Sequence, residues 1–87
     1  MHPEMSGNRA ELRLRSGEDV YALVELLRRM DDAFSIESLT GNRKVNAKSL
    51  LGVLYMMLEY LDGMYLVNET HAGLIPAGVS CFLAANA

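Results

Sequence analysis

Few residues in this chain could do chemistry. Its single cysteine is Cys81 and its two histidines are His2 and His71. A lone thiol excludes an internal disulfide and a zinc cluster built on several cysteines. Within its apolar run Cys81 is expected to be a small core residue. His2 falls in a leader segment and His71 is expected at the surface or at a cap, so none of the three indicates a catalytic or metal site.

Two positions are candidates for phosphoryl chemistry. Glu18 and Asp19 follow Ser16 and Gly17 where a helix should begin, and Ser49 directly precedes an apolar segment. An aspartyl phosphate at Asp19 would generally need a divalent metal held by further carboxylates. Glu18 alone supplies too few ligands for such a metal. Acids at a helix start are ordinarily favoured by the helix dipole. We therefore expect Ser16 and Asp19 to form a capping pair and Ser49 to be an N-cap.

The elements that would carry these residues follow from the spacing of apolar side chains. Alternation predicts strands, and apolar residues at 20, 23, 24, 27 and 30 predict an amphipathic helix. Residues 40–42 supply a hairpin turn, and Pro76 and Gly78 interrupt a final helix that Thr70 could cap. The predicted order is strand 10–15, helix 20 to about 31, strands 33–39 and 43–47, helix 50–57, strand 64–69 and a last helix.

This order, together with the segment 41–54 (GNRKVNAKSLLGVL), resembles HPr, the histidine-containing phosphocarrier of the bacterial phosphotransferase sugar-uptake system. The likeness covers roughly residues 10–87, and its specific part is the run 45–54 followed by Asp62-Gly63 before a strand. It implies an α+β fold, an open-faced β-sandwich whose four-stranded antiparallel sheet has the order 1-4-2-3 with three helices on one face. Residues 1–9 are then a loose leader before one HPr-like domain, 10–87.

The chain departs from the family at the active site. Members carry Gly-Leu-His-x-Arg-Pro where strand one meets helix one, and the histidine accepts and passes on a phosphoryl group. Here Asp19 stands at the histidine position, Tyr21 at that of the arginine and Ala22 at that of the proline. With Glu18, Asp19 also places negative charge where the phosphate should sit. The resemblance therefore predicts a protein without the phosphocarrier reaction, and no enzyme.

One functional position of the family is kept. Ser49 corresponds to a serine that a dedicated kinase phosphorylates in some bacteria, after which the protein binds a transcriptional regulator. A phosphate there would lie at a helix N-terminus, where N–H groups and the dipole favour it. Ser49 could also be no more than a cap. The segment after it has more apolar surface than one face can bury, so part of it could form a partner-binding patch.

Composition narrows the classes of partner and compartment. The net charge is −3 and the eight Lys and Arg residues are scattered, so no nucleic-acid partner is expected. No secretory signal is visible at the start, which makes the cytoplasm the default location. The eighteen uncharged residues 70–87 contain glycines and a proline and barely reach the length of a membrane span, so none is predicted. No cofactor or metal is predicted.

The uncharged segment 70–87 predicts an interface instead. Its large apolar residues fall near helical spacing, and no charged residue marks a side that faces water. We expect a short or broken helix covered by a second chain, which would give a homodimer. Three functions therefore stay open: a noncatalytic HPr-like regulatory or adaptor protein, a phosphocarrier with an unorthodox site, or an unrelated small α/β dimeric binding module.

Overall fold

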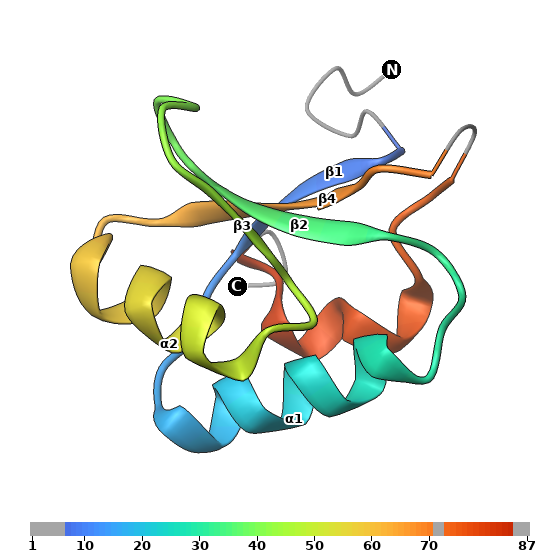
Figure 1. The fold of residues 1–87 in the computed structure, drawn as a ribbon, viewed down its shortest axis with the longest axis horizontal. Coiled ribbons are helices and arrows are strands. Elements are labelled where there is room, and N and C mark those ends of the chain that lie inside the picture. The colour runs from blue at the N-terminus through green and yellow to red at the C-terminus, as the bar shows by residue number, and fades with distance from the viewer. Residues whose placement is uncertain (1–6, 71–72, 85–87) are drawn as a thin grey trace.

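Four strands and three helical segments make up the part of the chain that the computed structural model describes, residues 7–70 and 73–84. The strands form one sheet, and the helices lie together beneath one of its faces (Figure 1). In chain order the elements are β1 (Arg9–Leu12), α1 (Gly17–Arg28), β2 (Phe34–Ser38), β3 (Lys44–Asn46), α2 (Leu50–Glu59), β4 (Met64–Asn68) and the 3₁₀ helix η1 (Ala77–Phe82).

The sheet has the order β1-β4-β2-β3, and every neighbouring pair is antiparallel. β1 and β2 both run against β4, so they are parallel to each other and need α1 as a crossover connection. β3 and β4 both run against β2, and α2 connects them in the same way. The result confirms the predicted α+β class, with its four-stranded antiparallel sheet of order 1-4-2-3.

The core lies between the sheet and the helices. Successive side chains of a strand point to opposite faces, so Leu12, Ile36 and Leu66 face the helices while their chain neighbours face away. The buried stripe of α1 is the one that the sequence spacing predicted, except that Met30 lies beyond the helix and is half-buried. The fully buried large side chains are Val20, Leu23, Val24, Leu27, Ile36, Val53, Met56, Leu66 and Val79.

The hairpin between β2 and β3 confirms the predicted turn. Gly41 has φ +82°, a left-handed conformation that glycine adopts without steric cost. Its N–H donates to the carbonyl of Ser38 at 2.9 Å, and the N–H of Ser38 donates to the carbonyl of Arg43 at 2.9 Å. The turn thus places Arg43 and Lys44 beside the end of β2.

The C-terminal part is a 3₁₀ helix, shorter than a regular α-helix. Pro76 precedes it in extended conformation without a side-chain cap, and the predicted cap Thr70 is wrong because its hydroxyl accepts instead from the N–H of Ala33 at 2.8 Å. η1 packs beside α1, and Val79 and Phe82 are buried in the core. Leu83 forms an antiparallel bridge with Leu12, so this segment also runs along the outer edge of β1.

The structure corrects three local predictions. Arg9, predicted to belong to the leader, begins β1 and pairs with Val67 of β4. The same strand ends at Leu12 instead of Arg15, because the N–H of Arg13 donates to the carbonyl of Phe82 at 2.7 Å. Cys81 is exposed and not in the core, since residues three apart share a side of a 3₁₀ helix and that inward side belongs to positions 79 and 82.

Asn68 ties the end of β4 to two loops. Its side chain is buried and its amide nitrogen donates to a carboxylate oxygen of Asp32 at 2.9 Å and to the carbonyl of Leu74 at 2.8 Å. Its side-chain oxygen accepts from the N–H of Thr70 at 2.9 Å. A Cβ on Gly73 would lie 2.5 Å from this amide, so only glycine allows the chain to pass here.

None of the helices described for residues 7–70 and 73–84 has both the length and the apolar character needed to cross a membrane.

Candidate phosphorylation sites at two helix starts

The start of α1 holds Asp19 in a capping pair, as predicted. Ser16 is the N-cap and its hydroxyl accepts from the N–H of Asp19 at 3.2 Å. In return, the Oδ2 atom of Asp19 accepts from the N–H of Arg15 at 2.9 Å. The two side chains therefore satisfy donors that would otherwise lack a partner at the helix start. One carboxylate oxygen of Asp19 is thereby bonded to the chain that leads into the helix.

Little around Asp19 is suited to a phosphoryl group. The side chain two positions on is the exposed Tyr21, which carries no charge. Within residues 7–70 and 73–84, no group of three or more histidine, cysteine, aspartate or glutamate side chains is placed to hold a metal ion. His2 and His71 lie outside the described residues. The geometry at Asp19 is thus that of a helix cap.

Ser49 is the N-cap of α2, which confirms its predicted structural role. Its hydroxyl accepts from the N–H of Gly52 at 3.2 Å, and its carbonyl accepts from the N–H of Val53 at 2.9 Å. Gly52 belongs to the first turn of the helix and has a local reason to be glycine. A Cβ there would come within 3.3 Å of both the Ser49 hydroxyl and the Val45 side chain.

Two cationic residues lie next to Ser49. The ammonium of Lys48 donates to the carbonyl of Met30 at 2.6 Å. The Nε atom of Arg28, in the last turn of α1, donates to the carbonyl of Lys48 at 2.9 Å. A phosphate on Ser49 would therefore meet the free N–H groups of the first turn of α2 and two nearby cations, the surroundings that an anion favours.

The two helix starts are separate sites. Asp19 lies in the first turn of α1, whereas Ser49 adjoins Arg28 in its last turn. Asp19 and Arg28 are nine positions apart along the helix, a rise of about 13.5 Å. The structure therefore does not bring Asp19 and Ser49 into one site.

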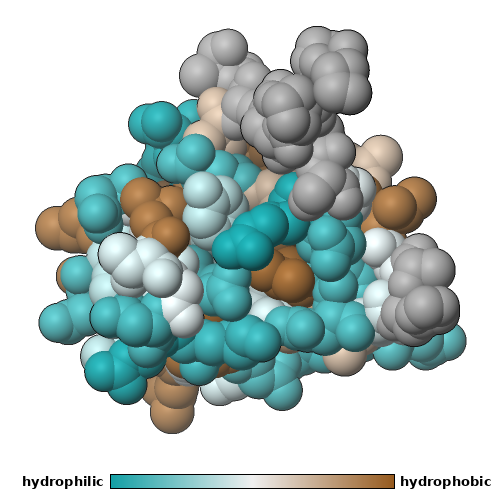
Figure 2. Space-filling model, turned by 90° about the horizontal axis from the view of Figure 1, so that it is seen from above, coloured by the Kyte–Doolittle hydropathy of each residue, from teal (hydrophilic) through white to brown (hydrophobic). Residues whose placement is uncertain are grey.

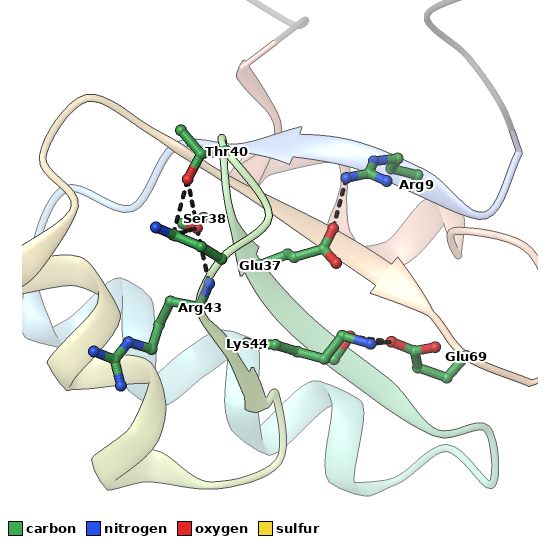
Figure 3. A network of polar contacts seen from close by, with 9 residues as sticks. Arg9, Glu37, Ser38, Thr40, Arg43, Lys44 and Glu69 are labelled. Carbon is green, nitrogen blue, oxygen red and sulfur yellow. Dashed lines mark hydrogen bonds and ion pairs between the residues drawn. The ribbon is translucent and has the colours of Figure 1, made fainter.

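A polar network covers the sheet face away from the helices, and sequence reasoning missed it. Arg9 pairs with Glu37 at 2.5 Å and its guanidinium lies over the Tyr65 ring at 4.5 Å. Lys44 pairs with Glu69 at 3.0 Å (Figure 3). Hydrophilic side chains predominate in the visible part of this face (Figure 2). The one signal in the sequence was polar residues at alternate positions of β1, β2 and β3.

Glu69, the residue that follows β4, is bonded to side chains of both β2 and β3. The hydroxyl of Ser35, which is buried, donates to its Oε2 atom at 2.5 Å. This bond, and next the bond from Lys44, lower the pKa of Glu69 below its ordinary value of 4.5. The carboxylate raises the pKa of Lys44 in turn. The side chains of Ser35, Lys44 and Glu69 thus link β2, β3 and the end of β4 through a hydrogen bond and an ion pair.

An open hollow of about 460 Å³ adjoins this end of the sheet. Its charged lining consists of Asp31, Asp32, Lys44, Lys48 and Glu69. Two cations among three carboxylates give it no excess of positive charge, so the hollow does not select an anion. It brings Lys48, beside Ser49, to the same concave surface as Lys44.

The outer side of α2 is apolar and largely exposed, with the guanidinium of Arg43 over the Tyr55 ring at 5.7 Å. Leu51, Leu58 and, just past the helix, Leu61 are 80, 68 and 85 % exposed, and Tyr55 between them is 40 % exposed. Val53 and Met56 on the opposite side are buried. The predicted excess of apolar surface after Ser49 is therefore real, and it lies on one face.

Comparison with known proteins adds no relative. No protein-family model matches the chain, and neither the characterised proteins nor the solved structures searched contain a significant match.

Proposed function

We propose that this chain is a noncatalytic HPr-like protein related to the phosphotransferase sugar-uptake system, an open-faced sandwich that acts as a regulatory or adaptor partner. The element order and the sheet order 1-4-2-3 that this resemblance implied are present. The observation that carries the proposal is Ser49. It matches the family's regulatory serine and caps α2 with its hydroxyl bonded to the N–H of Gly52.

The arrangement at Asp19 argues against a phosphoryl relay. A carrier needs a nucleophile that gains and loses phosphate readily, with a cation to stabilise the transferred group. Asp19 has an exposed tyrosine at the position of the family's arginine, and one of its carboxylate oxygens accepts the backbone N–H of Arg15, just before the helix. In this proposal the N-terminus of α1 is a structural remnant of the family's site.

Regulation at Ser49 would work through charge. A phosphate adds about two negative charges at neutral pH together with three strong acceptor oxygens. These oxygens would take the helix N–H groups that the hydroxyl now serves, and would attract Lys48 and Arg28 from their present carbonyl partners. The phosphate would offset the positive charge of Lys48 and Arg28 at the start of α2, a change of surface charge that a second protein can recognise. The partners in this proposal are cytoplasmic: a serine kinase, a transcriptional regulator or phosphotransferase components.

Two phosphorylation reactions on the purified full chain test the proposal. With phosphoenolpyruvate and the first phosphotransferase enzyme, intact mass spectrometry should show no acid-labile phosphate. With ATP and an HPr-type serine kinase, one acid-stable phosphate should appear. It should be absent from Ser49→Ala and present in Ser80→Ala, a control variant that removes an exposed serine of η1 instead.

The opposite results distinguish the alternatives. A labile phosphate that disappears in Asp19→Asn or in a His71 variant would establish a phosphocarrier with an unorthodox site. An absence of kinase labelling would remove regulation at Ser49 and, with it, the observation on which the proposal depends.

A further inference from the structure

We draw no further inference here: the strongest candidate, the exposed apolar face of α2 around Leu51, Tyr55 and Leu58, carries none because the cations beside the helix already have partners within the chain, and nothing in the structure shows what covers it.

Discussion

Single hydroxyl groups begin both α-helices of this protein. Ser16 and Ser49 each accept the N–H three residues ahead, at 3.2 Å in both cases. The first also has a reciprocal acid, Asp19, whereas the first turn of α2 has none. Among the described residues, the Ser49 hydroxyl is therefore the only side-chain acceptor shown for the start of α2. Its loss should destabilise this end of the helix.

Replacement of Ser49 by alanine should reduce the free energy of unfolding by about 0.5–2 kcal/mol, the usual cost of a lost N-cap. Ser49→Asp should recover most of this loss, because aspartate caps as well as serine and adds a favourable charge. Urea unfolding of the three proteins measures both effects. Equal stability of the alanine and wild-type proteins would show that the Ser49 hydroxyl does not hold the helix start.

At the scale of elements, the sheet is joined by side chains as well as by its backbone. The bonds of Glu69 to Ser35 and Lys44 connect β4 with β2 and β3, and the pair of Arg9 with Glu37 connects β1 with β2 across β4. The helix-facing side is held mainly by apolar packing, with the buried amide of Asn68 bonded to Asp32 and Leu74 at one end. Charged side chains therefore help to hold the strands together on the outer face of the sheet.

The lowered pKa of Glu69 makes part of the stability depend on pH. A folded-state pKa below 4.5 means that the ionised carboxylate stabilises the fold above pH 4.5, and that this contribution disappears as pH falls through the folded pKa. Glu69→Gln should therefore be slightly less stable than the wild type at neutral pH. The effect is small because both charges are exposed to water.

Urea unfolding of the two proteins at a series of pH values measures this. The difference between them should close below pH 4.5, where the wild-type carboxylate becomes neutral like the amide. A difference that stays constant across the acid range would mean that the amide disturbs the network for some reason other than charge.

At the scale of the whole molecule, the C-terminal segment completes the core. Val79 and Phe82 join the buried cluster, and Ile75 and Leu83 pack against it. The carbonyl of Phe82 accepts from Arg13, and the N–H of Ile75 donates to the carbonyl of Gly7. Residues 75–83 therefore pack against both the edge of β1 and one side of α1.

Phe82→Ala should lower the free energy of unfolding by about 3 kcal/mol, the low end for a phenylalanine because this side chain is 8 % exposed. Leu74→Ala, in the same segment but mostly exposed, should change it by no more than about 0.5 kcal/mol. Thermal and urea unfolding compare the two. Equal, small effects would place the segment outside the cooperative core.

Local patterns were enough to predict most of the elements and the N-caps of both α-helices. The helix α1, the turn at Gly41 and the N-caps Ser16 and Ser49 each depend on residues within a few positions of one another. Propensity, capping and turn chemistry act over that distance, so the sequence states them directly. The sheet order was also predicted, through resemblance and not through local pattern.

Tertiary structure alone decided which surfaces stay open. α2 is apolar on nearly every side, so no periodicity could show that Leu51 and Leu58 face outward. The bond between Ser35 and Glu69 joins residues 34 positions apart, and the buried Phe82 meets Arg13, which lies 69 positions before it, through a backbone hydrogen bond. These features arise when distant segments pack together, and that step determines both the exposed apolar face of α2 and the contact of the C-terminal segment with the edge of β1.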